Sequence, residues 1–319
     1  MTEQRVLVTG ADGFVGTELC RRLVADGFRV RGALWEANDL PDGCEVTVVG
    51  DIGPTTDWSS ALADVGVVVH LAARVHMMSD GAAEPLAEYR RVNVEGTRRL
   101  AEMAVDAGVR RFVFMSSIKV NGEQTEGKPF LPDDPPAPVD PYGLSKWEAE
   151  QALESICSDG GMENVIIRSP LVYGPGVKAN FLRLFRAVDR GMLLPVGALR
   201  NKRSFMGLRN LADILVECVR NDAAAGEVFL VSDGEDMSTP GLVCRIGRAL
   251  DRTPRLISVP APVLRFAGLV TGKTSAVDRL CGSLVVDSSK VREALGWSPV
   301  STAEEELARV AEWYRRVAD

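Results

Sequence analysis

Residues 5–16 read RVLVTGADGFVG, a short apolar run that passes directly into three spaced glycines. The run Arg5–Thr9 is rich in β-branched residues, which is typical of a strand that is covered on both faces. Gly10, Gly13 and Gly16 let the backbone turn sharply into a following helix, whose N-terminus would face a pyrophosphate. A tight turn alone would also use these glycines, but their place at the first strand–helix junction favours a dinucleotide site.

Strand-like and helix-like segments continue to alternate along the chain. The predicted strands are Arg5–Thr9, Arg29–Leu34, Val46–Val49, Val67–Leu71, Arg111–Met115, Val165–Arg168 and Val228–Val231, and the predicted helices include Thr17–Ala25, Glu95–Ala107 and Tyr142–Ile156. This alternation predicts an α/β fold with a doubly wound parallel sheet. Prolines and glycines become frequent after Arg168, so we expect a smaller C-terminal substrate-binding domain there.

Composition limits the partners of this chain. Its 319 residues carry 37 Lys and Arg against 44 Asp and Glu, a net charge of −7 that argues against nucleic acid. The N-terminus has no secretory signal pattern, and no run approaches the roughly 18 apolar residues of a membrane span, so we expect a cytoplasmic protein without a membrane partner. Six dispersed cysteines and two histidines favour reduced thiols and no metal site.

Tyr142 and Lys146 form the strongest candidate catalytic pair. Their i,i+4 spacing places both on one face of a helix, so we expect the ammonium to lower the pKa of the phenol. Ser116 and Ser117 end an earlier predicted strand, where a hydroxyl could hold the same substrate oxygen. A surface Tyr–Lys pair has the same spacing, but its occurrence together with the glycine loop favours catalysis.

The predicted cofactor site has one departure from the usual pattern. Leu34 and Trp35 stand where a ribose-binding acid is expected, and Glu36 is the nearest carboxylate, so the choice between NAD and NADP stays open. Asp51 follows the third predicted strand and either accepts from an adenine amino group or caps a loop. Small side chains close the fourth strand at residues 71–73, as a backbone lying against a cofactor requires.

These motifs, together with NVEGT at 93–97, VYGPG at 172–176 and LGWSP at 295–299, resemble the extended short-chain dehydrogenase/reductases. Within that group the chain looks like the NAD-dependent epimerase/dehydratase branch, which acts on nucleotide sugars. The resemblance implies an NAD(P)-binding Rossmann domain of residues 1–168 plus 204–232 and a nucleotide-sugar domain of residues 169–203 plus 233–319. The cofactor contacts that it implies are Gly10, Gly13, Phe14, Val15, Gly16, Trp35, Asp51, Ile52, Leu71, Ala72, Ala73, Asn93, Ser116, Tyr142 and Lys146.

The same resemblance implies catalytic and substrate-binding residues. Ser117 would be the catalytic serine beside Tyr142 and Lys146. The implied substrate contacts are Ser117, Asn180, Phe181, Arg203 and Arg279, with the arginines on a diphosphate. Asn180 could instead cap a helix, and each arginine could be a solvated surface cation. Leu171 and Asn121 depart from the family's usual Asn and Tyr, so contacts near the substrate are expected to differ.

The implied activity is NAD(P)-dependent oxidation and reduction at C4 of a UDP-hexose, with an acetamido-deoxyhexose favoured. The leading interpretation is 4-keto reduction in bacterial surface-polysaccharide synthesis, and the alternative is a UDP-hexose 4-epimerase with tightly bound NAD. Dehydration is disfavoured because Ile118 and Lys119 stand where dehydratases carry Asp and Glu. A non-catalytic NAD(P)-sensing protein is a distant alternative, and a homodimer is left open. We expect His70 to be structural, whereas His76 could reach the substrate.

Overall fold

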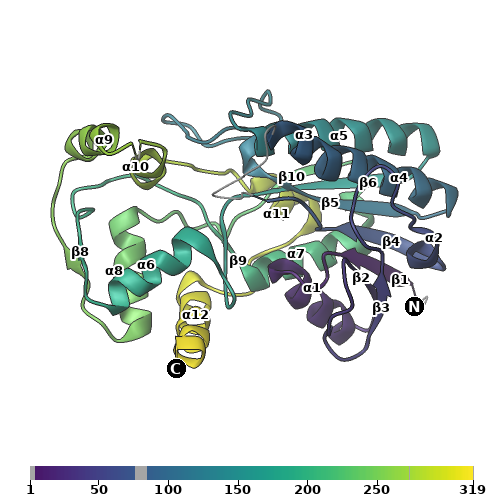
Figure 1. The fold of residues 1–319 in the computed structure, drawn as a ribbon, viewed down its shortest axis with the longest axis horizontal. Coiled ribbons are helices and arrows are strands. Elements are labelled where there is room, and N and C mark those ends of the chain that lie inside the picture. The colour runs from purple at the N-terminus through teal and green to yellow at the C-terminus, as the bar shows by residue number, and fades with distance from the viewer. Residues whose placement is uncertain (1–3, 76–84, 273, 319) are drawn as a thin grey trace.

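A twisted parallel sheet forms the centre of the main lobe (Figure 1). The computed structural model describes residues 4–75, 85–272 and 274–318. Within these residues the sheet has seven strands in the order β10-β6-β5-β4-β1-β2-β3, and all of its neighbours pair in parallel. The strands are β1 (Arg5–Thr9), β2 (Arg29–Leu34), β3 (Cys44–Val48), β4 (Val65–His70), β5 (Arg111–Ser117), β6 (Glu163–Ser169) and β10 (Val228–Leu230). The predicted doubly wound parallel sheet is confirmed.

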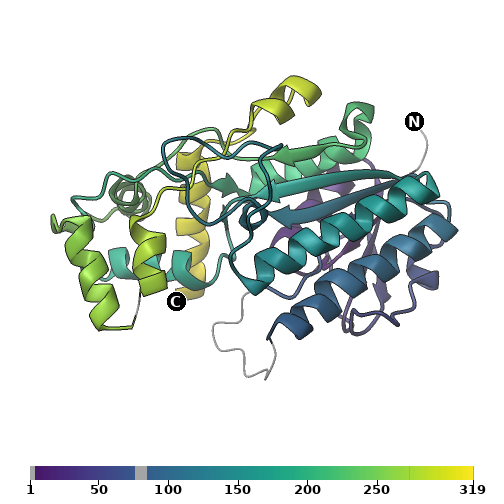
Figure 2. The ribbon, with the colours of Figure 1, turned by 90° about the horizontal axis from the view of Figure 1, so that it is seen from above.

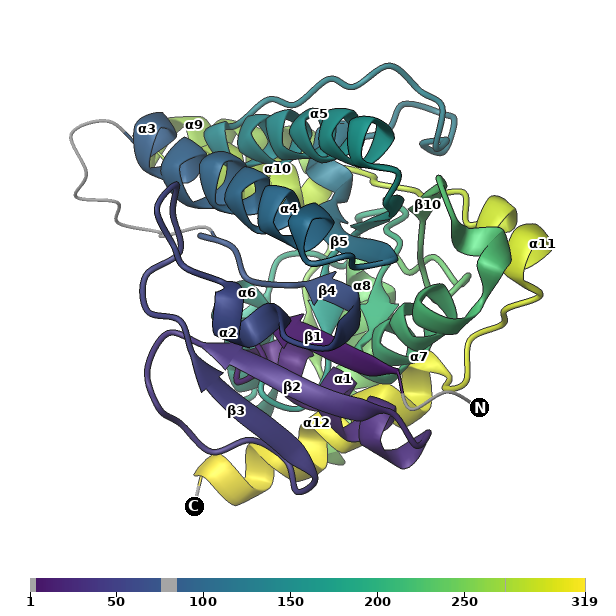
Figure 3. The same cartoon turned by 90° about the vertical axis from the view of Figure 1, so that its right-hand side faces the viewer.

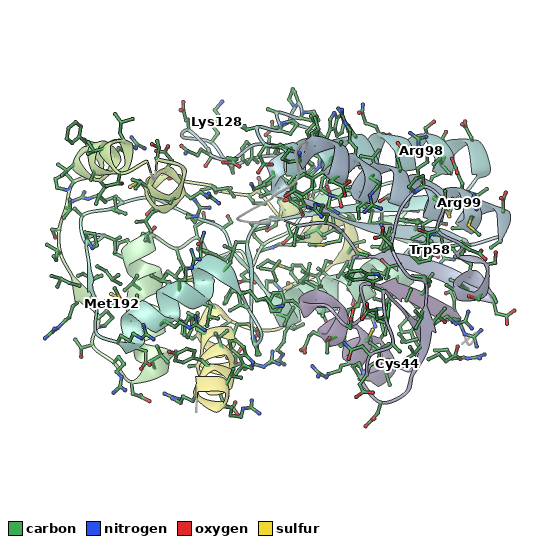
Figure 4. The ribbon with its side chains drawn as sticks, in the orientation of Figure 1. Cys44, Trp58, Arg98, Arg99, Lys128 and Met192 are labelled. Carbon is green, nitrogen blue, oxygen red and sulfur yellow. The ribbon has the colours of Figure 1, made fainter. Side chains whose placement is uncertain are left out.

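Helices cover both faces of this sheet (Figure 3). Helices α1 (Phe14–Ala25) and α7 (Leu208–Arg220) pack on one face through an aliphatic core. The other face is covered by α4 (Gly96–Asp106) and α5 (Pro141–Gly160), with the fully buried Trp58 in the same cluster (Figure 4). Shorter elements on the main lobe are α2 (Ser59–Leu62), α3 (Pro85–Tyr89), the π-helix η1 (Arg90–Glu95) and the 3₁₀ turns η2 (Ile118–Val120) and η3 (Asp222–Ala224).

The order in which successive strands are added to the sheet reverses between β1 and β4. From β1 the chain continues outward to β2 and β3, whereas β4 leads to β5, β6 and β10 on the other side. Doubly wound sheets bind ligands in the crevice outside the carboxyl ends of the strands at such a point. The glycine loop follows β1 and residues 71–73 follow β4, so both predicted cofactor segments lie at this crevice.

A smaller lobe lies beside the sheet (Figures 1 and 2). It contains the paired strands β7 (Val172–Tyr173) and β9 (Met206–Gly207), and β8 (Leu193–Leu194) and β11 (Arg255–Leu256). Its helices are α6 (Ala179–Asp189), α8 (Thr239–Leu250), α9 (Ala261–Val270), α10 (Thr274–Cys281) and α12 (Ala303–Ala318). Its core is separate from that of the sheet and is rich in aromatic rings, with Phe181 stacked on Tyr173 and Phe185 beside it.

The predicted domain boundaries separate one helix from the residues that it contacts. Helix α11 (Ser289–Leu295) packs against β10, and Val291 and Trp297 belong to the core of the main sheet. The sequence-based boundaries assign these residues to the substrate domain. We therefore propose that residues 289–297 fold with the main lobe, while the remaining boundaries stay predictions.

The other sequence-based expectations concern thiols and membrane spans. All six cysteines are free, and four of them are buried, whereas Cys44 on the edge strand β3 (Figure 4) and Cys244 are only partly buried. Among the described residues, no helix has the length and apolarity needed to cross a bilayer.

Candidate active site

The glycine loop and the end of β4 are in backbone contact. Gly10 has a φ of +63°, and a Cβ there would lie 3.2 Å from the backbone of Ala72. A Cβ on Gly16 would come within 2.1 Å of the Gly10 carbonyl oxygen. The first turn of α1 has no side-chain cap, so its backbone N–H groups remain available to an anion. A cradle that only glycine permits, next to a helix N-terminus, fits the pyrophosphate of a dinucleotide.

Phe14 and Val15 hold this loop through their side chains. Phe14 packs against the core of the smaller lobe, and Val15 packs against the core of the sheet. Their predicted contacts with the cofactor would therefore come from their backbone. Phe14 also connects the glycine loop to the smaller lobe, because its ring lies 3.6 Å from the position of a Cβ on Gly176.

His70 is a buried structural residue, as expected. The Thr97 hydroxyl donates to the Asn93 carbonyl, so it must accept from Nε2 of His70 at 3.1 Å. Nδ1 then accepts from the Thr9 hydroxyl at 2.7 Å, and the Thr9 oxygen accepts the backbone N–H groups of Leu71 and Ala72. Burial lowers the pKa of His70 to about 3, so the ring stays neutral. His76 lies outside the described residues.

Asn93 links the segment after β4 to helix α5, which carries Tyr142 and Lys146. It lies in the π-helix η1, accepts from the Arg74 backbone N–H at 2.8 Å and donates back to the Arg74 carbonyl. Its amide also donates to Ser145, whose hydroxyl donates to the Tyr142 carbonyl at 2.8 Å. Both N–H donors of the amide and one lone pair of its oxygen are used inside the protein, so its predicted role as a cofactor contact gains no direct support from this geometry.

Ser117 and Tyr142 meet at the end of β5. The Ser117 side chain hydrogen-bonds the Tyr142 phenol and works against the effect of burial, which raises the pKa of that phenol. The Asp140 carboxylate raises the pKa further. Asp140 caps the helix that carries Tyr142 by accepting from the Gly143 N–H at 2.7 Å. The two predicted catalytic oxygens are therefore brought together by a strand end and a capped helix start.

Lys146 lies on the same helix but contacts the strand. Its Nζ donates to the Met115 carbonyl at 2.8 Å and lies 4.5 Å from the centre of the Phe114 ring. Burial lowers the pKa of Lys146 to about 7. The structure thus differs from the expected activation of the phenol by the ammonium: in this state burial dominates the pKa of Tyr142, and Ser117 supplies the hydrogen bond that opposes it.

Ser116 belongs to a buried ionic network instead of the cofactor crevice. Successive strand residues face opposite sides of a sheet, and the Ser116 hydroxyl donates to the Glu150 carboxylate. Glu150 is paired with Arg168 at 2.6 Å, and the guanidinium also donates to the Asn121 amide oxygen. The expected cofactor contact of the Ser116 side chain is not supported. Asn121, which departs from the family pattern, is part of this network.

Sequence reasoning missed Glu150 and Arg168, which look like ordinary surface charges. Only the position of Glu150, four residues after Lys146, could have suggested that it points inward on the same helix face.

The adenosine end of the predicted cofactor site is more exposed. Trp35 follows β2 and is 69% exposed. Asp51 accepts from Nη1 of Arg91 at 2.7 Å, while Ile52 packs against the sheet core. An aromatic surface and a carboxylate thus lie beyond neighbouring strands, but the carboxylate already has a cationic partner.

Two predicted arginines meet in the smaller lobe. Nη1 of Arg203 donates to the Arg279 carbonyl at 2.9 Å and to the Gly282 carbonyl at 3.2 Å. Burial and the nearby charge of Arg279 lower the pKa of Arg203. The contact joins the Arg203 guanidinium to the Arg279 backbone, and the Arg279 charge is near enough to lower the pKa of Arg203. A diphosphate is an anion that fits two such positive charges.

The predicted pair Asn180 and Phe181 is divided between surface and core. Asn180 is exposed in the first turn of α6, whereas the Phe181 ring stacks on Tyr173 at a centroid distance of 5.4 Å. A substrate contact by the Phe181 side chain is therefore not supported. Leu171, which stands where the family usually has Asn, is 42% exposed.

Comparisons with known proteins agree with this geometry. Residues 6–232 match the NAD dependent epimerase/dehydratase family. The chain belongs to this family. A UDP-glucose 4-epimerase from Vibrio cholerae is 47% identical over 310 residues, which cover 96% of this chain and 94% of that protein. The matched family is NAD dependent, so this protein is an NAD-dependent enzyme, and its similarity to UDP-sugar enzymes indicates UDP-sugar chemistry. We propose that the cradle at the glycine loop holds the NAD.

Two less similar relatives extend the comparison. N-acetyl-alpha-D-glucosaminyl-diphospho-ditrans,octacis-undecaprenol 4-epimerase from Escherichia coli O157:H7 is 29% identical over 91% of this chain and 89% of its own length. The structure of MoeE5 in complex with UDP-glucose and NAD has a TM-score of 0.79 and 27% identity, and it covers 99% of this chain and 100% of that chain.

Proposed function

We propose that the protein is a UDP-hexose 4-epimerase that keeps its NAD bound through the reaction. The similarity at 47% identity to a protein named UDP-glucose 4-epimerase, over almost the full length of both chains, carries this proposal. It favours epimerisation over the 4-keto reduction that the sequence motifs favoured. The hydrogen-bonded Ser117 and Tyr142 beside the NAD cradle support chemistry at a single hydroxyl.

Tyr142, Ser117 and Lys146 would have different roles in the reaction at C4. NAD, when bound, supplies the hydride acceptor and donor. Tyr142 Oη would take the proton of the C4 hydroxyl and later return it, while Ser117 holds the same oxygen. Burial raises the pKa of the phenol, so it keeps its proton at neutral pH until positive charge lies beside it. Lys146, one helical turn away, is the residue we expect to supply that charge.

Epimerisation further requires the 4-keto sugar to rotate within the site, so that its opposite face is presented to the nicotinamide. The hydride then returns to its opposite face. The arginine pair Arg203 and Arg279 would hold the diphosphate during this turn, because it binds the part of the substrate that does not react.

Dehydration fits the site less well. Ile118 is buried, and the Lys119 ammonium bonds Glu123 at 2.9 Å and also contacts Asp140. These two positions follow the catalytic serine, where elimination of water would need an acid–base pair.

The test is incubation of the purified protein, without added cofactor, with UDP-glucose and separately with UDP-GlcNAc. We expect UDP-galactose or UDP-GalNAc to form, with no net oxidation or reduction of nicotinamide, and the Tyr142→Phe variant to form them about 10²–10⁴-fold more slowly. The proposal is overturned if both sugars are returned unchanged while a UDP-4-keto sugar is reduced with one equivalent of NADPH consumed. That result would restore 4-keto reduction.

A further inference from the structure

Lys119 lies between two carboxylates in the 3₁₀ turn η2, directly after β5. Its ammonium donates to Glu123 at 2.9 Å and to the Asp140 carboxylate. The Lys119 and Asp140 side chains are each 19% exposed and the Glu123 side chain is 33% exposed, so water screens these charges only in part. Glu123 is also close enough to Arg203 for its charge to raise the pKa of that guanidinium. The ammonium therefore joins two carboxylates from different segments, Asp140 immediately before α5 and Glu123 in the loop after η2.

Asp140 divides its two carboxylate oxygens between the start of α5 and Lys119. Oδ1 accepts from the Gly143 N–H at 2.7 Å and caps the helix, while Oδ2 accepts from the Lys119 ammonium. The negative charge of Asp140 disfavours ionisation of the Tyr142 phenol two residues later and raises its pKa. An ammonium on the same carboxylate opposes that effect, because it carries the opposite charge.

The backbone of Lys119 contacts the other half of the acid–base pair. Its N–H donates to the Ser117 hydroxyl oxygen at 3.3 Å, which leaves the hydroxyl proton for the phenol or for a substrate oxygen. A Cβ on Gly143 would lie 2.8 Å from the Lys119 carbonyl oxygen, so η2 packs directly against the first turn of α5. Lys119 therefore contacts both elements that carry the acid–base residues, the end of β5 and the start of α5.

The other titratable groups near Tyr142 in the described part of the chain lie on α3, on α5 and after β4. The Tyr89 ring of α3 meets the Tyr142 ring edge-on at a centroid distance of 6.1 Å, and its phenol also raises the pKa of Tyr142. The Arg74 guanidinium lies 5.8 Å from the centre of the Tyr89 ring. Lys146 follows one helical turn after Tyr142. Of these groups and Asp140, the carboxylate of Asp140 has the largest effect on the phenol.

We propose that Lys119 is a positioning residue for the proton transfer at C4: its ammonium balances the charge of Asp140 beside Tyr142, and its backbone N–H orients the Ser117 hydroxyl. The inference rests on the proposed roles of Tyr142 and Ser117. It applies to epimerisation and to 4-keto reduction alike, because both would pass a proton through the same phenol.

The test is the pH dependence of kcat/KM, with NAD bound, for the UDP-sugar that the protein turns over. Lys119→Met leaves the Asp140 charge unbalanced, so the pKa that Tyr142 contributes to the profile should rise by about half a unit or more. Asp140→Asn keeps a side-chain oxygen for the helix cap but removes the charge, so that pKa should fall. The double variant should lie between the two single variants.

The matched control is Lys128→Met, which removes an exposed lysine from the loop between η2 and α5 (Figure 4). Its pH profile should be that of the unchanged protein. Equal pKa values for Tyr142 in all variants, or shifts in the same direction for Lys119→Met and Asp140→Asn, would overturn the proposal. A structural defect alone would not produce opposite shifts from the two partners of one ion pair.

A second measurement separates this inference from the proposed function. If the protein turns over no UDP-sugar, the proposed function fails, and NMR of ¹³C-labelled tyrosine in the protein with bound NAD reads the Tyr142 pKa instead. The chain has four tyrosines, and the Tyr142→Phe variant assigns the resonance. The pKa should again be highest in Lys119→Met and lowest in Asp140→Asn, and the absence of that order would overturn the role of Lys119.

Discussion

The buried pair Glu150 and Arg168 gives a sharp prediction about stability. The two side chains are 2% and 4% exposed, and their closest contact is 2.6 Å. Arg168→Met keeps most of the aliphatic length but removes the guanidinium, so the carboxylate stays buried with Ser116 as its remaining hydrogen-bond partner among the described residues. Removing one partner of a buried ion pair costs about 3–5 kcal/mol. We expect the lower half of that range, because the Ser116 bond remains.

The matched double variant, Glu150→Met with Arg168→Met, removes both charges. Replacing a buried pair by apolar side chains is often close to neutral, so the double variant should recover most of the loss. Urea unfolding followed by tryptophan fluorescence gives the free energy of unfolding of each variant. Arg90→Met is the control, because the Arg90–Glu148 pair is 49% and 25% exposed and its loss should cost less than about 1 kcal/mol. An Arg168→Met variant within about 1 kcal/mol of the unchanged protein, or a double variant less stable than either single one, would refute this reasoning.

Three further predictions concern single residues. Tyr142→Phe should lower kcat by about 10²–10⁴-fold and leave UDP binding, measured by calorimetry, nearly unchanged, because only the transferable proton is lost. Arg203→Ala should raise KM for the UDP-sugar much more than it lowers kcat, and an unchanged KM would reject its contact with the diphosphate. The buried neutral His70 has a folded-state pKa of about 3 against about 6.5 when unfolded, so its stabilisation is complete above pH 6.5 and is lost as the pH falls towards 3. Between pH 6.5 and pH 4.5 this amounts to about 2.3 kcal/mol, and denaturant titrations should show a His70→Asn variant losing that much less stability over the same interval; an identical pH slope would exclude the role.

The central strands could be predicted because parallel strands covered on both faces are nearly continuous apolar runs. Arg5–Thr9 and Arg29–Leu34 were predicted at their observed bounds. The edge strand β3 (Cys44–Val48) was predicted two residues late, at Val46–Val49, because its start is polar and partly exposed. An edge strand pairs on one side only, so its sequence is less constrained.

The candidate site could be predicted where a motif fixes local geometry, and not where distant residues meet. Ser117 and Tyr142 were expected together from the strand end and the YxxxK spacing, and they share a hydrogen bond. The contact of Lys146 with the Met115 carbonyl and the pairing of Glu150 with Arg168 depend on how α5 lies on the sheet. No short-range pattern encodes that packing.

The most direct test of the proposed epimerisation uses the UDP-hexose that the protein turns over, carrying deuterium at C4. The proposal requires one hydride to leave C4 and return to the opposite face of the same sugar. We therefore predict that the epimeric product retains its deuterium at C4 by NMR and mass spectrometry, with no exchange with solvent and no reduced nicotinamide released. Loss of the label to water, or release of one equivalent of deuterated NADH per sugar, would contradict the proposal.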